Sequence, residues 1–109
     1  MKILLDECVT RKLKRHLTEF ETKTVVEMNW SGFNNGSLMN AAVADEFDIL
    51  LFIDKNLEHQ QNMSKYEIAV VVLDAEKSKI EFLHEILPEF KERVGEFEKG
   101  KIYLIEKYI

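Results

Sequence analysis

Apolar positions along the chain alternate between short continuous runs and stretches with helical spacing. Continuous runs predict strands at residues 2–5, 49–53 and 69–73. Residues 22–26 are rich in β-branched side chains and residues 101–106 follow a glycine, so two further strands are expected there. The runs at 49–53 and 69–73 lack polar alternation, which is typical of strands that are covered on both faces.

Helical spacing appears between these runs. Leu13, Leu17 and Phe20 recur at i, i+4 and i+7, which predicts an amphipathic helix of about three turns. The alanine-rich residues 37–47 predict a helix packed closely on the sheet. Residues 27–36 show no periodicity and are expected to form a loop between strand and helix.

A third helix is expected after residue 78. Ser78 and Glu81 have the spacing of a capping box. In this motif each of the two side chains accepts a hydrogen bond from the backbone N–H of the other residue. Pro88 is expected to kink this helix or split it in two, because proline removes a donor and clashes with the preceding turn. The alternation of strands and helices predicts an α/β domain with a mainly parallel sheet, spanning residues 1–109.

Length and composition agree with one ordinary globular domain. The 109 residues are 46% hydrophobic and include one cysteine, Cys8, so no internal disulfide is expected. The longest apolar run is far shorter than the roughly 20 residues of a membrane span, and residues 1–6 lack a signal-peptide pattern. We therefore expect a cytoplasmic protein with no membrane contact.

Charge gives a mixed indication about partners. The net charge of −5 argues mildly against a general nucleic-acid coat, because backbone binding depends on Lys and Arg. It does not argue against a nuclease, whose metal site needs carboxylates. Residues 11–15 also carry a basic block of two arginines and two lysines.

Three predicted strands end in an acid: Asp6, Asp54 and Asp74. In a parallel sheet these carboxylates would emerge at one edge, where ligands bind in open α/β sheets. Clustered carboxylates favour a hard divalent cation such as Mg²⁺. Aspartate at a strand end also starts turns and caps helices, which needs no function. Trp30, in the predicted loop, either stacks on a nucleobase or covers the sheet edge.

These residues together resemble a family. The run at residues 2–7, then Trp30-Ser31-Gly32 with Asn35-Gly36, then residues 54–57 with 60–62, resemble the compact bacterial PIN-like domains, relatives of the nucleases of toxin–antitoxin pairs. The resemblance covers essentially the whole chain. It implies a three-layer α/β/α sandwich and hydrolysis of RNA that depends on Mg²⁺ or Mn²⁺.

The resemblance also implies roles for individual residues. Asp6 and Asp54 match the catalytic acids that hold the metal, and Glu7 matches the acid that often follows the first. Ser37 stands where relatives usually carry an acid, and Asp74 is a substitute by position. Residues expected to position RNA are Arg11, Lys12, Asn35, Asn56 and Gln60.

Other interpretations stay open. The loss of an acid at Ser37 and the negative net charge favour a catalytically inactive PIN-like module that acts through a protein partner. An antitoxin-like partner and a homodimer are both compatible with the resemblance. A phosphatase with an aspartate nucleophile is disfavoured, because the first strand is followed by Asp6-Glu7-Cys8 rather than by a DxD arrangement. A structural protein without a site is the remaining alternative.

Overall fold

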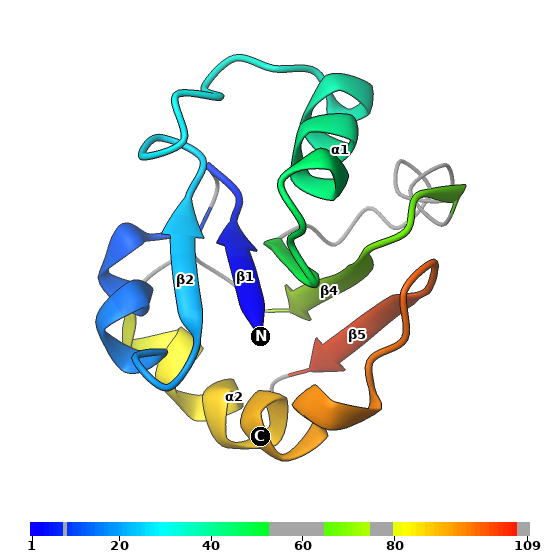
Figure 1. Cartoon of the computed structure of the whole chain (residues 1–109). Helices are drawn as coiled ribbons and strands as arrows, with labels where there is room; N and C mark the ends of the chain where they lie inside the picture. The colour runs from blue at the N-terminus through cyan, green and yellow to red at the C-terminus, as the bar shows by residue number, and fades with distance from the viewer. Residues whose placement is uncertain (8, 53–64, 75–79, 107–109) are drawn as a thin grey trace.

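The computed structural model describes residues 1–7, 9–52, 65–74 and 80–106. Within those ranges the strands are β1 (Lys2–Leu5), β2 (Glu21–Thr24), β3 (Ile49–Phe52), β4 (Ala69–Asp74) and β5 (Ile102–Glu106). They form one sheet in the order β2-β1-β3-β4-β5, in which every neighbouring pair is parallel (Figure 1). The α/β fold class is confirmed, and the described sheet is entirely rather than mainly parallel.

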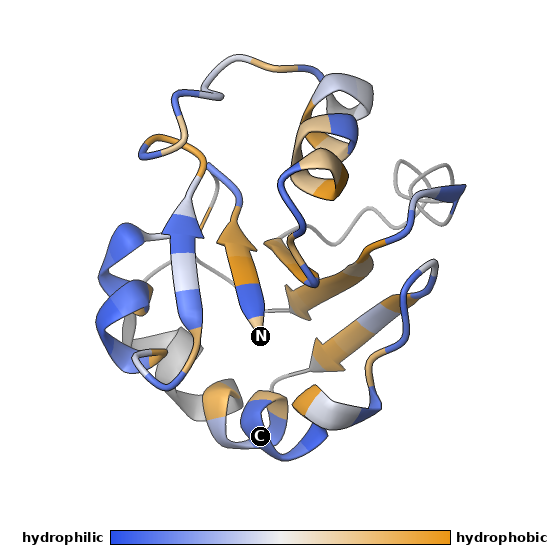
Figure 2. Ribbon diagram, viewed as in Figure 1, coloured by the Kyte–Doolittle hydropathy of each residue, from blue (hydrophilic) through white to orange (hydrophobic). Residues whose placement is uncertain are grey.

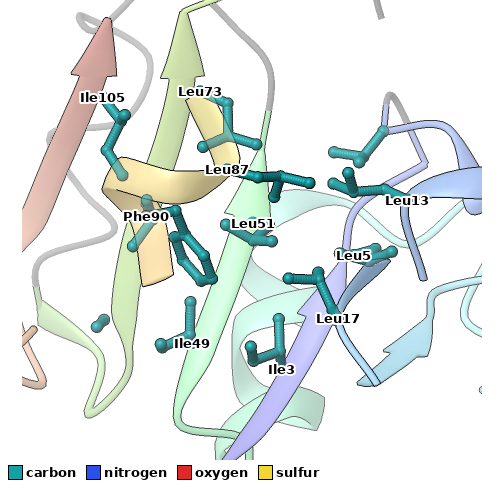
Figure 3. Close-up of a cluster of buried hydrophobic side chains, with 13 residues drawn as sticks. Ile3, Leu5, Leu13, Leu17, Ile49, Leu51, Leu73, Leu87, Phe90 and Ile105 are labelled. Atoms are coloured by element: carbon teal, nitrogen blue, oxygen red, sulfur yellow. The ribbon is translucent and has the colours of Figure 1, made fainter. Parts of the chain in front are cut away.

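Helices cover both faces of this sheet. They are the 3₁₀ helix η1 (Arg11–His16), α1 (Asn35–Ala44), α2 (Ile80–Arg93) and the 3₁₀ turn η3 (Val94–Glu96). Side chains of η1 and α2 pack on one face, as Figure 3 shows for Leu13, Leu17 and Phe90. Side chains of α1 pack on the other face. No helix in the described ranges is long and apolar enough to cross a membrane.

Alternation along the strands sorts the core into two layers. Ile3 and Leu5 of β1 face η1 and α2, whereas Leu4 between them faces α1. The predicted core residues are confirmed, each with at most 1% of its surface exposed: Leu5, Ile49, Leu51, Val70 and Val72. Figure 2 shows the contrast between the apolar central strands and the polar edge strand β2.

The connections between strands do not all have the same hand. The chain moves from β1 to β2 in one direction across the sheet and passes over the face that η1 covers. It moves from β4 to β5 in the opposite direction, yet α2 covers that same face. These two crossovers therefore have opposite hands. The connection through α1 shares the hand of the first, so among these three connections β4 to β5 is the one that differs, in a class of connection that is nearly always right-handed.

The expected three-turn helix after β1 is wrong in type and length. Leu13 and Leu17 are fully buried as the pattern predicts, but they lie on a six-residue 3₁₀ helix. Six residues of 3₁₀ helix rise about 12 Å, which matches the roughly 13 Å length of a four-residue strand. The short helix thus returns the chain to the start of β2, while a longer α-helix would extend past the sheet.

Three further boundaries differ from the expectation. Strand β2 ends at Thr24, two residues early, and Val26 is 69% exposed. Helix α1 begins at Asn35 and ends at Ala44, after which Glu46 takes a left-handed φ of 62° and turns the chain so that Phe47 enters the core. Helix α2 is not split at Pro88, because Leu87 and Phe90 anchor it to the sheet on both sides of the exposed proline. Its predicted capping residue Ser78 lies outside the described residues.

Leu51 lies at the centre of the sheet and tests the assignment of the core. Truncation in Leu51→Ala leaves a cavity beneath α2, so the free energy of unfolding is expected to fall by about 2–5 kcal/mol. Urea denaturation measures this change. The matched control Val26→Ala removes methyl groups at an exposed position and is expected to shift stability by less than about 0.5 kcal/mol. Equal effects of the two substitutions would contradict the central position of β3.

Candidate functional site

Asp6 lies at the carboxyl end of β1, at the point where the chain changes direction across the sheet. In the sheet, β2 lies on one side of β1 and β3 lies on the other. Ligands of open α/β sheets bind in the crevice at such a point. The Asp6 N–H donates to the carbonyl of Leu51 at 3.0 Å, and its own carbonyl accepts from the N–H of Val9 at 3.0 Å. The backbone of this half-buried acid is therefore fixed between β1 and β3.

A cleft of about 710 Å³ opens beside Asp6. Its walls are the ends of β1 and β2 and the helix η1, with lining residues that include four cations (Arg11, Lys12, Lys14, Arg15) and three acids (Asp6, Glu7, Glu27). A second hollow of about 440 Å³ shares three of these cations and extends the basic surface along η1. A chain with a net charge of −5 thus carries a slight excess of positive charge in this cleft.

Glu7 connects the cleft to the loop that follows β2. Its Oε1 accepts a hydrogen bond of 2.8 Å from the N–H of Gly32. Gly32 has a φ of +83°, a conformation that side chains rarely adopt, so glycine is suited to this position. Glu7, for which the resemblance implies a catalytic role, therefore holds a loop in place, with one oxygen committed to a backbone donor.

Lys14 and Glu27 close the cleft on the β2 side. The Lys14 Nζ lies 2.8 and 2.7 Å from the two carboxylate oxygens of Glu27. Glu27 is itself held by Thr24, because the Thr24 N–H donates to Glu27 Oε1 and the Glu27 N–H donates to Thr24 Oγ1, both at 3.0 Å. This reciprocal pair is a capping box on a single turn of chain. The hydrogen bond from Lys14, together with those from Thr24, lowers the pKa of Glu27.

The first turn of α1 contains two of the predicted positions. Asn34 caps the helix, with its Oδ1 accepting the Ser37 N–H at 2.7 Å. Asn35 is the first helical residue, and Ser37 is exposed two positions later. Because α1 follows β2 and begins near the carboxyl ends of the strands (Figure 1), Ser37 belongs to the same edge of the sheet as Asp6.

The structure brings only part of the predicted site together. Four of its residues line one cleft: Asp6, Glu7, Arg11 and Lys12. Asp54, Asn56 and Gln60 lie outside the described residues, so an ion shared by Asp6 and Asp54 stays a prediction. The backbone of Asp74 ends β4 and pairs with Glu106. Among the residues that the structure describes, no three of His, Cys, Asp or Glu gather as a metal site.

Sequence reasoning missed the residues that shape the cleft. The T-x-x-E spacing of Thr24 and Glu27 was available, but the β-branched run around it was interpreted as strand throughout. The cap at Asn34 was likewise visible as an asparagine just before the expected helix.

Comparison of the chain with protein-family models, curated proteins and solved structures finds no match.

Glu27→Gln isolates the charge of the Lys14–Glu27 pair, since glutamine can still accept the Thr24 N–H. Lys14 lowers the pKa of folded Glu27 below its ordinary value of 4.5. The ion pair therefore stabilises the fold fully above that value, and its contribution disappears as pH falls through the lowered pKa. Glu27 is 39% exposed, so solvent screening limits the gain to at most about 1 kcal/mol.

Urea denaturation at a series of pH values measures this dependence. The wild type is expected to exceed Glu27→Gln in stability at pH 7 and to converge with it as pH falls from 4.5 toward 2. Glu21→Gln, at the opposite end of β2, is the matched control for loss of one carboxylate. A difference between wild type and Glu27→Gln that persists unchanged at low pH would rule out the ion pair as its source.

Proposed function

We propose that this protein is a PIN-like, metal-dependent ribonuclease. The observation that supports this proposal best is the position of Asp6, which lies at the carboxyl end of a central parallel strand and in the wall of a cleft with four cationic side chains. Lysine and arginine attract the phosphates of a nucleic-acid backbone. A carboxylate beside them supplies an oxygen ligand for a hard divalent ion.

The carboxylates of the cleft fit such an ion only in combination with Asp54. Asp6 and Glu7 follow β1 directly, and one oxygen of Glu7 is committed to the Gly32 N–H. Two carboxylates give weak binding, so the proposed site needs Asp54, which the sequence places two residues beyond β3. A bound Mg²⁺ or Mn²⁺ would lower the pKa of a water and stabilise charge on the phosphate.

The other residues of the cleft bind and orient the substrate in this proposal. Arg11, Lys12 and Arg15 supply charge for successive phosphates along η1. Lys14 is held by Glu27 and contributes to the wall rather than to the phosphate. The backbone bond from Asp6 to Leu51 keeps the acid in register with the end of β3.

A second candidate is a PIN-like module that binds RNA or a protein partner without cleaving RNA. One observation favours it. Glu7 and Glu27, which both line the cleft, accept hydrogen bonds from groups of the protein itself. This leaves fewer oxygens for an ion than the number of acids suggests.

Cleavage of a labelled RNA in the presence of Mn²⁺ separates the two candidates. Asp6→Asn and Asp54→Asn each remove a proposed metal ligand. The rate is expected to fall at least about 10–100-fold, the range seen when even an outer partner of a metal ligand is removed. Glu21→Gln removes a carboxylate at the amino end of β2 and should cleave like the wild type. Wild-type protein that binds RNA without cleaving it would support the second candidate.

Ser37→Glu restores an acid in the first turn of α1. It is expected to raise the affinity for Mn²⁺, because another anion near the edge of the sheet compensates more of the ion's charge. Calorimetric titration of Mn²⁺ into wild type and Ser37→Glu measures the gain, with Ser37→Gln as the neutral control of similar size. The gain should vanish in the Asp54→Asn background. A gain that survives there would show that the added acid binds the ion elsewhere.

A further inference from the structure

Phe33 is an exposed aromatic side chain supported by a second ring. It is 44% exposed and lies on Trp30, with ring centroids 6.3 Å apart and an interplanar angle of 22°. Trp30 in turn meets the edge of Phe47 at 5.9 Å and packs against the buried cluster beneath α1. Trp30 thus packs against the core and holds Phe33 at the surface.

The backbone fixes this pair of rings beside the cationic cleft. The Trp30 N–H donates to the carbonyl of Val25 at 3.0 Å, and the Phe33 N–H donates to the carbonyl of Trp30 at 3.2 Å. Between them the Gly32 N–H binds Glu7, whose side chain lines the cleft. The backbone that carries the exposed ring is therefore attached to a wall of the cleft.

The surroundings of Phe33 fit a flat aromatic ligand better than they fit a protein partner. Among the described residues, the large apolar side chains that are exposed are Phe33, Val26 in the cleft and Met1 at the start of β1. A stable protein interface needs about 800 Å² per partner with an apolar centre, and these separate residues do not provide one. An exposed ring whose neighbour Gly32 is bonded to the wall of a cationic cleft matches the bases and phosphates of a single polynucleotide strand.

We propose that Phe33, backed by Trp30, is a stacking site for an unpaired nucleobase of a strand whose phosphates lie in the cationic cleft. The inference rests on the proposed function in that a polynucleotide is the ligand of the cleft. It adds a base-binding position that the metal-binding acids do not supply. Aromatic stacking tolerates any base, so the site contributes affinity and holds the strand in place rather than selecting a sequence.

Binding without cleavage tests this proposal in a metal-free buffer with EDTA. The probes are a fluorescein-labelled oligoadenylate and a ribose-phosphate oligomer of the same length that lacks bases, titrated by anisotropy. Phe33→Leu keeps an apolar side chain and removes the ring, whereas Phe33→Tyr keeps the ring as the matched control. Phe33→Leu is expected to weaken binding of the oligoadenylate by about 5- to 150-fold, the range for one stacked base. Phe33→Tyr should bind like the wild type, and all three proteins should bind the abasic oligomer equally.

Trp30 gives an independent measurement, because it is the one tryptophan in the sequence. Its fluorescence should change when the oligoadenylate binds to wild type and to Phe33→Tyr, and should stay constant with the abasic oligomer. Equal weakening of both oligomers by Phe33→Leu would overturn the stacking site, as would no weakening of either. Failure of the wild type to bind oligoadenylate would also overturn it.

The outcome is separable from that of the proposed function. Binding that depends on Phe33 and on bases, without cleavage in Mn²⁺, would support stacking and contradict the ribonuclease. Cleavage that depends on Asp6, with binding that is insensitive to Phe33→Leu, would support the ribonuclease and contradict stacking. Near-ultraviolet circular dichroism of Phe33→Leu, compared with Phe33→Tyr, verifies that the fold is retained.

Discussion

Burial of β1 on both faces and pairing on both edges determine where the chemistry of this protein lies. Leu4 packs beneath α1 while Ile3 and Leu5 pack beneath η1 and α2, and β1 pairs with β2 and with β3. A four-residue strand held in this way cannot shift by one residue without moving its apolar side chains to the wrong layer. The next residue along the chain, Asp6, is therefore delivered to a fixed position at the edge of the sheet.

Charge at that edge is balanced locally rather than over the whole molecule. Glu7 and Glu27 of the cleft have partners of two kinds, a backbone N–H for Glu7 and a lysine for Glu27. These contacts tie the loops after β1 and β2 to each other, so the walls of the cleft are part of the structural framework. A basic surface can consequently exist on an acidic chain, since its positive charges come from one short helix at residues 11–16.

Much of the fold could be predicted from the sequence because the decisive signals are local. Continuous apolar runs identify β3 and β4, where both faces of the strand are covered. Every residue of such a run is therefore expected in the core, and the apolar residues of both strands are buried. The type of η1 could not be predicted, because the spacing of Leu13 and Leu17 reports the buried face and not the hydrogen-bond pattern. Val25 and Val26 were misassigned to the strand for a similar reason, since only the contact between Thr24 and Glu27 reveals that the turn begins after Thr24.

The candidate site was predictable to a smaller extent. Asp6, Arg11 and Lys12 could be placed together, because a strand end and the helix after it are neighbours along the chain. The bond between Glu7 and Gly32 joins segments that are distant in sequence, and no local pattern announces it. The exposure of Phe33 was also hidden, since phenylalanine in a sequence normally indicates a core position.

The all-parallel sheet also constrains the order in which the chain can fold. No neighbouring pair of described strands can form as a local hairpin, because Lys2 pairs with Glu21 and Ile3 pairs with Ile49. During synthesis the apolar strand β1 therefore emerges long before β3, its neighbour on the side away from β2. Pairings so distant along the chain are slow to form, and until they form the apolar side chains of β1 are without their full cover. The same strand that fixes Asp6 in the finished protein is thus exposed to mispairing while the protein is being made.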